Sequence, residues 1–199
     1  GFCWPAASGI GGQTMMLIHL AEEGRTIALD GSSRAPHRAT LDAVETKASR
    51  LRGHRATTVP STPATLSHAL EKFGTLKLSQ VMAPAIRLAR EGYPVTSLQA
   101  ALTKRKLKNL RAGTAAPFFL KNGRSVYRVG ETFKQPVLAT TLSRLARYGI
   151  EIFYRGSIAK KIHRDMKAND GLLHLDDLAQ IPWPIERKPV SCKFRGHRV

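Results

Sequence analysis

The chain has 199 residues, of which 42% are hydrophobic and 23% are charged, and its formal net charge at pH 7 is +18. These values are typical of a globular protein with one sizeable core, and they exclude an intrinsically disordered chain. No apolar run approaches the roughly 18 residues that a membrane-spanning helix requires. Residues 1–12 lack the basic start and the long apolar centre of a signal peptide. We therefore expect a single domain over residues 1–199, without a membrane span.

The excess of basic residues, 32 lysines and arginines against 14 acidic residues, predicts a surface that attracts anions. Nucleic acid is the first partner to consider. The basic residues are nevertheless spread along the whole chain, and their one local cluster accompanies no recognised nucleic-acid-binding motif. A basic helix of this kind is more often a solvated face than a reader of bases, so nucleic-acid binding is not predicted. The cluster consists of Lys104, Arg105, Lys106, Lys108 and Arg111.

The only cysteines, Cys3 and Cys192, lie near opposite ends of the chain. Their spacing matches no metal-binding motif. A single disulfide bond is compatible with the sequence, but two free or buried thiols are the simpler interpretation.

Two strands are predicted near the start of the chain, at Thr14–Leu20 and Thr26–Asp30, joined by a tight turn over residues 22–25. The apolar residues at 15–18 run without interruption, which indicates a strand covered on both faces. His19, within this apolar strand, is expected to be partly buried with its hydrogen bonds satisfied. Because an isolated hairpin is not stable, these strands require a larger sheet.

Helical periodicity replaces this pattern after residue 60. Ser79 is expected to cap the second helix, and glycines at 74, 92, 149 and 171 mark helix ends. The chain is expected to end with a short helical turn over residues 176–180 and a strand over residues 189–199. The predicted fold class is therefore α+β: a hairpin, a run of helices, then a strand. The expected core-facing residues of the four main helices are Leu66, Ala69, Leu70 and Phe73; Met82, Ile86 and Ala89; Leu138, Leu142 and Leu145; and Ile158, Ile162 and Met166.

Taken one by one, the polar residues identify no catalytic group, cofactor site or metal site. The glycine-rich residues 9–12 precede a strand and lack the lysine of a phosphate-binding loop, so a backbone turn is expected there. Asp176 and Asp177 are typical of the first turn of a helix, where carboxylates favour the positive end of the dipole. Ser8 lacks the flanking pattern of a nucleophile elbow, and the seven histidines show no paired-ligand spacing.

Several segments, in the correct order, resemble the large subunit of gamma-glutamyltransferases and of related cephalosporin acylase-like enzymes. The resemblance begins with the glycine-rich residues 7–12 and continues through Ala28-Leu29-Asp30 and Arg34-Ala35-Pro36. Its most specific parts are Lys72-Phe73-Gly74-Thr75-Leu76 and the segment from Ala83 to Val95. Later matches are residues 153–159, 171–173 with 176–178, and 195–199, so the resemblance covers nearly the whole chain.

This resemblance implies part of an N-terminal-nucleophile hydrolase, a four-layer αββα sandwich, made as a precursor that cleaves itself into large and small subunits. The nucleophile is then the threonine that begins the small subunit, and its own α-amine acts as the base. The implied substrates are gamma-glutamyl or acyl amides, the implied partner is the small subunit, no cofactor is implied, and the location is periplasmic or secreted. The chain stops before that threonine, so residues 1–199 alone are expected to be inactive.

The chain departs from the family at the position of the arginine that holds the substrate α-carboxylate. Aligned without gaps, that position is Ser32, and the nearest arginine is Arg34. Arg34 and Ser32 are therefore the predicted substrate-binding residues, although Arg34 is also close enough in sequence to pair with Asp30 or Asp42. Ser61 likewise stands where the family usually has glycine. Two alternatives stay open: an amidase or acylase with another acyl group, and a non-catalytic basic protein that binds anions.

Overall fold

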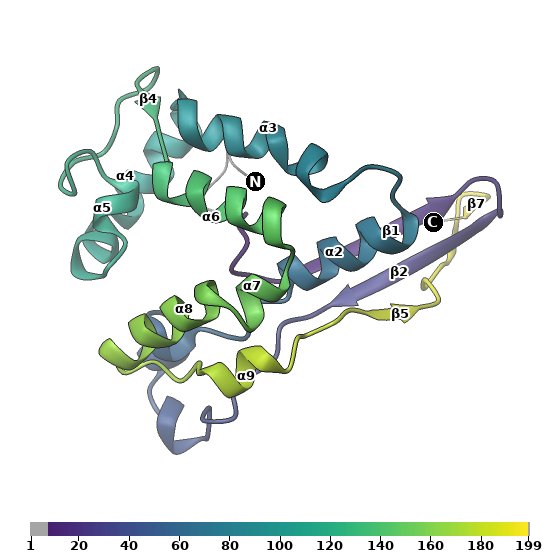
Figure 1. Ribbon diagram of the computed structural model, residues 1–199, viewed down its shortest axis with the longest axis horizontal. Helices are drawn as coiled ribbons and strands as arrows, with labels where there is room; N and C mark the ends of the chain where they lie inside the picture. The colour runs from purple at the N-terminus through teal and green to yellow at the C-terminus, as the bar shows by residue number, and fades with distance from the viewer. Residues whose placement is uncertain (1–7, 199) are drawn as a thin grey trace.

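The sheet of the protein is built on the predicted hairpin. The computed structural model describes residues 8–198, in which β1 (Thr14–Leu20) pairs antiparallel with β2 (Arg25–Gly31) (Figure 1). Gly24 in the turn has a φ of +60°, a conformation that glycine adopts without steric cost. A third strand, β5 (Ile185–Arg187), pairs antiparallel with β2 and gives the order β1-β2-β5. Both predicted strands and their tight connection are confirmed.

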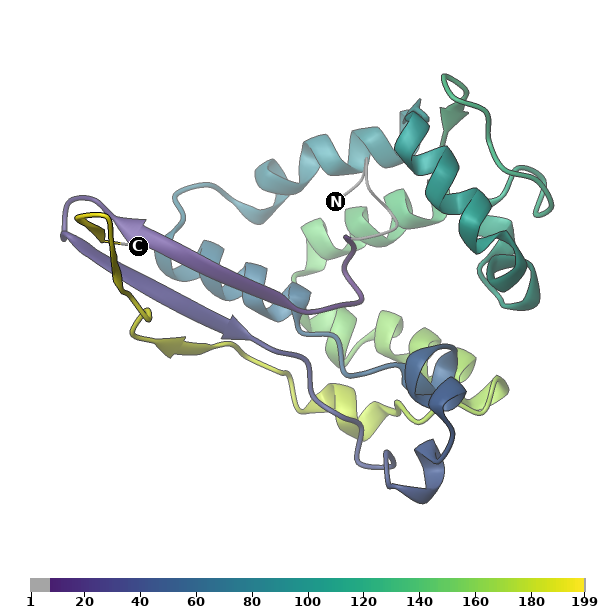
Figure 2. The same cartoon turned by 180° about the vertical axis from the view of Figure 1, so that it is seen from behind.

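The two faces of this sheet have different surroundings. α2 (Thr62–Phe73) lies along one face, in front of the strands in Figure 1 and behind them in Figure 2. On the other face Met15 is 65% exposed and Leu17 is 71% exposed. The prediction that β1 is covered on both faces is therefore wrong for the described residues, because an uninterrupted apolar run does not reveal how many faces are packed. His19 is also exposed, with its Nδ1 3.0 Å from Thr26 Oγ1.

α2 forms where it was predicted and ends at Gly74, but it buries a different face. Leu66, expected in the core, is 47% exposed. The residues that α2 buries are small or carry hydroxyl groups, since the helix lies close to the strands and its buried hydroxyls are hydrogen-bonded, that of Thr62 to Thr14 of β1 and those of Thr65 and Ser67 within the α2 segment. They are Thr62, Pro63, Ala64, Thr65 and Ser67.

The other three predicted helices are confirmed as α3 (Leu78–Glu91), α6 (Pro136–Tyr148) and α8 (Ser157–Ala168). α3 and α6 pack side by side (Figure 1). The N-terminal cap of α3 is Lys77, one residue before the helix, so the prediction that Ser79 caps it is wrong. Lys77 takes this place because Gln80 accepts a hydrogen bond from its backbone N–H.

Shorter elements connect these helices. Residues 42–56 form two turns of 3-10 helix and one short α-helix, and residues 93–133 form a lobe of two helices and a two-stranded sheet, seen at the upper right of Figure 2. The basic cluster lies on α4, where Lys104, Arg105, Lys106, Lys108 and Arg111 are exposed. The bounds are η1 Asp42–Val44, α1 Lys47–Leu51, η2 His54–Ala56, β3 Tyr93–Pro94, α4 Ser97–Ala112, α5 Ala116–Phe119, β4 Thr132–Phe133, α7 Glu151–Tyr154 and α9 Leu175–Ala179.

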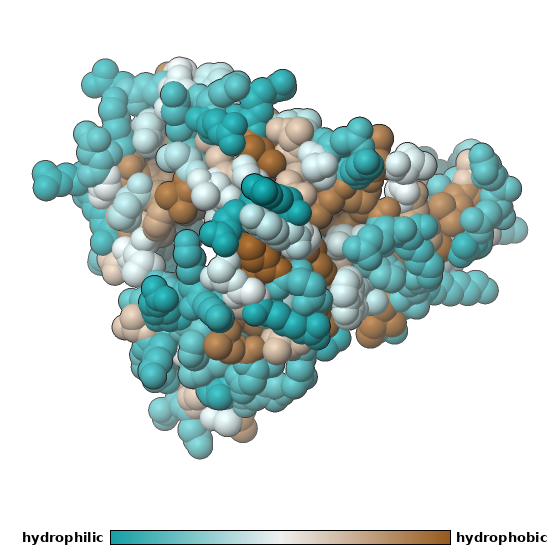
Figure 3. Space-filling view, viewed as in Figure 1, coloured by the Kyte–Doolittle hydropathy of each residue, from teal (hydrophilic) through white to brown (hydrophobic). Residues whose placement is uncertain are grey.

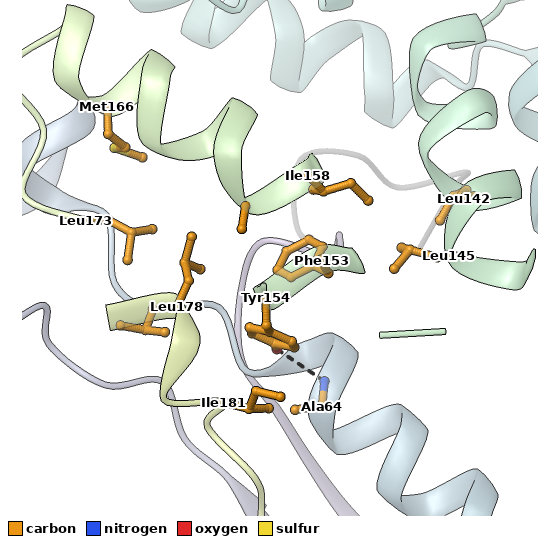
Figure 4. Close-up of a cluster of buried hydrophobic side chains, with 12 residues drawn as sticks. Ala64, Leu142, Leu145, Phe153, Tyr154, Ile158, Met166, Leu173, Leu178 and Ile181 are labelled. Atoms are coloured by element: carbon orange, nitrogen blue, oxygen red, sulfur yellow. Dashed lines mark hydrogen bonds between the residues drawn. The ribbon is translucent and has the colours of Figure 1, made fainter. Parts of the chain in front are cut away.

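The main hydrophobic core lies where α2, α6, α7, α8 and α9 meet (Figure 4). Tyr154 is its most deeply buried aromatic residue and also links two segments. Its hydroxyl donates to the Pro60 carbonyl at 2.7 Å and accepts from the Ala64 backbone N–H at 3.2 Å. Burial raises the pKa of the Tyr154 hydroxyl well above its usual value. The buried members are Val59, Ala64, Leu142, Leu145, Phe153, Tyr154, Ile158, Ala159, Met166, Leu173, Leu178 and Ile181.

The single strand predicted over residues 189–199 is wrong. Lys193–Phe194 (β6) and His197–Arg198 (β7) instead pair as a small hairpin, turned by Arg195 and Gly196, which both have positive φ. The strand that joins the main sheet comes earlier, at β5. Cys192 is exposed and free, and Cys3 lies outside the described residues.

Candidate functional site

β2 ends at Gly31, a glycine that no other residue can replace without displacing neighbouring atoms. A Cβ atom on Gly31 would lie 2.1 Å from Thr65 Oγ1 and 2.3 Å from the Thr14 carbonyl oxygen. Both distances are far below van der Waals contact, so the absence of a side chain lets β2 end directly against α2. The start of the loop is therefore fixed by close backbone packing.

Ser61 joins this loop to two other segments. Its side chain is fully buried, and its hydroxyl donates a short hydrogen bond to the Gly31 carbonyl. Its backbone N–H donates to the Gly12 carbonyl at 3.0 Å, and its carbonyl accepts from Thr65 Oγ1 at 3.0 Å. The serine found where the family usually has glycine thus holds the glycine-rich turn, the end of β2 and the start of α2 together.

Asp30 and Ser32 form a tight polar turn at the entrance of the loop. Asp30 Oδ1 accepts from the Ser32 hydroxyl at 2.6 Å and from its backbone N–H at 3.2 Å, and Oδ2 accepts from Arg187 Nε at 2.9 Å. The hydrogen bonds from Ser32, and next the one from Arg187, hold the pKa of Asp30 below its usual value. Because the Ser32 hydroxyl proton is directed at Asp30, its oxygen is left as a hydrogen-bond acceptor.

Arg34 is fixed through its backbone and free through its side chain. Its carbonyl accepts from the Val59 N–H at 2.8 Å, while Gln13 Oε1 accepts from the preceding Ser33 N–H at 3.2 Å. Within residues 8–198, the exposed Arg34 guanidinium forms no ion pair or hydrogen bond. The alternative pairing with Asp30 or Asp42 does not occur, since Asp30 pairs with Arg187 instead.

The far end of the loop is held by the start of α9. Asp177, whose side chain is 1% exposed, accepts from the His37 backbone N–H at 2.7 Å and from the His174 N–H at 2.8 Å. Arg38 makes two hydrogen bonds to Asp176, at 2.9 and 3.0 Å. The prediction that both carboxylates begin a helix is confirmed. Their second role was missed, because nothing in the sequence links residues about 140 positions apart.

No catalytic group emerges from the described residues. The Thr140 and Thr141 hydroxyls donate to backbone carbonyls one turn earlier in α6. In residues 8–198, no three His, Cys, Asp or Glu side chains gather where they could hold a metal ion. None of the helices described is both long and apolar enough to cross a membrane. The candidate site is thus the loop that carries Ser32 and Arg34.

Comparison with known proteins identifies this architecture. The profile of the Gamma-glutamyltranspeptidase family matches residues 1–199. The glutathione hydrolase proenzyme of Escherichia coli (strain K12) is 36% identical over 98% of this chain and 34% of its own length. The acylase ACY 1 proenzyme of Pseudomonas sp. (strain V22) is 31% identical over 98% of this chain and 37% of its own length.

Solved structures give the same result. The gamma-glutamyltranspeptidase of Helicobacter pylori superposes with a TM-score of 0.93 at 35% identity, covering all of this chain and 59% of that chain. The cephalosporin acylase of Bacillus halodurans superposes with a TM-score of 0.87 at 32% identity, covering 99% of this chain and 39% of that one.

The mixed helix-and-strand fold is thus that of N-terminal-nucleophile hydrolase-type enzymes. More particularly, this chain belongs to the gamma-glutamyltranspeptidase family. It spans about a third of the length of the curated relatives that it matches.

Proposed function

We propose that the complete protein transfers or hydrolyses gamma-glutamyl groups of glutathione-type substrates, and that residues 1–199 form one domain segment of its large subunit. The observation that carries this proposal is Arg34: an exposed guanidinium that has no partner among residues 8–198, on a loop fixed at both ends. The loop belongs to a chain that matches the family along its whole length.

In this proposal the nucleophile is a threonine outside residues 1–199, exposed when the precursor cleaves itself. Its hydroxyl attacks the gamma-glutamyl amide carbonyl while its α-amine accepts the proton. The amine leaving group departs, and the acyl-enzyme passes its acyl group to water or to an acceptor amine. The 199-residue chain by itself is then expected to release no chromophore from a gamma-glutamyl anilide. Turnover above that of a boiled control would contradict this assignment of the nucleophile.

Arg34 and Ser32 have complementary roles in this proposal. An arginine can donate two parallel hydrogen bonds to a carboxylate, so Arg34 binds the α-carboxylate of the glutamyl group. Ser32 cannot donate while its proton is held by Asp30, and its oxygen instead accepts a hydrogen bond from a substrate N–H.

Kinetics of the complete protein test this assignment. Arg34→Ala should lower kcat/KM roughly ten- to hundred-fold, mainly through KM, since a charge-assisted hydrogen bond contributes about 1.5–3 kcal/mol. Arg34→Lys should recover only part of the loss, because a lysine cannot donate two parallel hydrogen bonds to one carboxylate. Arg52→Ala is the matched control, since Arg52 is exposed and its guanidinium forms no hydrogen bond or ion pair with the residues that the structure describes. Unchanged kinetics in a folded Arg34→Ala variant would refute the role of Arg34.

Ser32 supports a second candidate, an amidase or acylase with a different acyl group. The residue aligned with the family's carboxylate-binding arginine is a serine that is already bonded to Asp30, and the relatives of this chain include an acylase proenzyme. Comparing a gamma-glutamyl anilide with the matching glutaryl anilide, which keeps the terminal carboxylate but lacks the α-amino group, separates the two. Preference for the gamma-glutamyl substrate supports the first function, and preference for glutaryl supports the second.

The open face of the sheet supports the proposed four-layer arrangement. Met15, Leu17 and Ile185 are each more than half exposed on β1 and β5. Apolar side chains on a sheet face are usually packed against another layer. We assign this face to the second sheet of an αββα sandwich, contributed largely by the small subunit of the same precursor.

A further inference from the structure

We propose that an open groove between α3, α6 and the start of α8 binds the phosphate group of a small molecule, at a site separate from the loop that carries Arg34. The groove has a volume of about 730 Å³. It is lined by Arg90 of α3, by Arg144 and Arg147 of α6, and by Ser157 at the first position of α8. The remaining lining residues are Thr140, Ser143, Tyr148 and Ile152.

The charges in this groove have one sign. Three arginines line it and no acidic residue does. Among residues 8–198, Arg90, Arg144 and Arg147 form no ion pair with a carboxylate. Three guanidinium groups around one open space repel one another unless an anion lies between them. The groove therefore favours an anion with more than one negative charge.

Arg144 supplies the most specific observation. Its Nη2 donates to the Ser157 hydroxyl oxygen at 2.8 Å, which fixes the guanidinium at the groove wall. Its Nε is shielded from solvent and has no hydrogen-bond partner among the described residues. A buried donor without an acceptor is costly, and a shift of the Arg144 side chain toward the groove would let a phosphate oxygen satisfy it.

The other polar groups fit the same ligand. The Ser157 hydroxyl accepts from Arg144 and so has its own proton available for a phosphate oxygen. The N-terminus of α8, a helix of 12 residues, adds a partial positive charge at the same wall. Figure 3 shows strongly hydrophilic side chains over the C-terminal half of α6 on this side of the molecule.

The dimensions indicate a phosphate ester rather than the ion alone. The groove, about 730 Å³ and widely open to solvent, has room for more than a bare phosphate. Tyr148 and Ile152 offer apolar surface beside the arginines for the remainder of the ligand. The preferred ligand class is thus a phosphate monoester carrying a small, partly apolar group.

Isothermal titration of the complete protein, with inorganic phosphate and with phenyl phosphate at constant ionic strength, tests the proposal. We expect saturable binding of phenyl phosphate at one site. Arg90→Gln and Arg147→Gln should each weaken it roughly tenfold or more, because each removes a charge-assisted hydrogen bond. Arg144→Gln should have the largest effect. Arg105→Gln, an equal charge change on the exposed face of α4, should leave the affinity unchanged.

The exposed positions of Arg90 and Arg147 keep the test valid even if Arg144→Gln unfolds the protein. Equal affinity of wild type, Arg90→Gln and Arg147→Gln for phenyl phosphate would overturn the proposal. A loss of affinity in the Arg105→Gln control as large as in these two variants would also overturn it, because it would indicate attraction by net charge alone. Binding of inorganic phosphate with the same affinity as phenyl phosphate would assign the groove to the free ion and refute the preference for an ester. Because binding is measured directly, these outcomes do not depend on gamma-glutamyl activity.

Discussion

The two faces of the β1-β2-β5 sheet differ in how they are packed. The face under α2 holds Ile27 and Leu29, which are nearly fully buried, and the Gly31 and Ser61 contacts that set the course of the loop after β2. The opposite face leaves Leu17 exposed. Residues 8–198 therefore complete the inner face and fix the loop after β2 by themselves, while the outer face is left open. If that loop binds substrate as proposed, it is preorganised independently of the rest of the proposed sandwich.

The largest expected effect contrasts equal substitutions on the two faces. In the 199-residue chain, Leu29→Ala should lower the free energy of unfolding by about 2–5 kcal/mol, since it removes a buried side chain. Leu17→Ala should change it by less than about 0.5 kcal/mol, since the side chain is 71% exposed.

The same pair in the complete protein sharpens the comparison. If a second sheet covers the outer face, Leu17→Ala should there destabilise by about 2–5 kcal/mol, as Leu29→Ala does. Denaturant unfolding of both proteins measures the difference. A neutral Leu17→Ala in the complete protein would contradict the proposed second sheet.

Gly31→Ala should destabilise the protein by about 1–3 kcal/mol, the usual cost of forcing extra volume into a packed region. The added Cβ would lie 2.3 Å from the Thr14 carbonyl oxygen, which belongs to the backbone of β1 and cannot rotate away. Gly11→Ala is the matched control, since a Cβ there meets no atom within 4 Å. Thermal unfolding of the two variants should separate them, and equal melting temperatures would show that β2 does not pack as described.

Ser61→Ala should cost about 1–3 kcal/mol, because the Gly31 carbonyl loses its buried hydrogen-bond donor. This loss of stability should be accompanied by faster amide hydrogen exchange at Ser33 and Arg34. Ser33→Ala is the control and should have little effect on stability, since the Ser33 side chain is only partly buried and its hydroxyl lies 3.5 Å from Gln13 Oε1. An unchanged exchange rate in Ser61→Ala would remove Ser61 from the support of the loop.

The smallest expected effect is a pH dependence from Asp30. Its pKa is lowered in the folded state, so its stabilising contribution is present above the unfolded-state pKa of about 3.9 and is lost as the pH falls through the folded-state pKa. The melting temperatures of wild type and Asp30→Asn should therefore differ at neutral pH and converge on acidification. A difference that grows on acidification would contradict the sign.

The sequence reveals local features of this fold better than its packing. The turn at Gly24 and the glycines that end the helices have local causes, so the hairpin and four helices could be predicted. Leu66 was placed in the core because hydrophobicity was weighed alone, whereas Thr65 and Ser67 are buried there with their hydroxyls satisfied. β5 was not predicted because it is only three residues long, contains a single apolar residue and comes just after two prolines.

The candidate site shows the same division. Resemblance located Ser32 and Arg34, but only the fold shows that Arg187, distant in sequence, pairs with Asp30, so that Arg34 has no partner in the part of the chain that the structure describes. The arginine groove was also beyond sequence reasoning, because it joins Arg90 of α3 to residues of α6 and α8 that lie dozens of positions later in the chain.

The central claim, that Arg34 binds the substrate α-carboxylate, is tested most directly by a crystal structure of the complete protein with a gamma-glutamyl group bound. The account predicts that two Arg34 nitrogens lie about 2.7–2.9 Å from the two carboxylate oxygens, as in a charge-assisted pair. The loop from Gly31 to Ser33 should keep the course it has here, with Ser61 still bonded to the Gly31 carbonyl. A carboxylate held by other residues, with the Arg34 guanidinium still in solvent, would contradict the account.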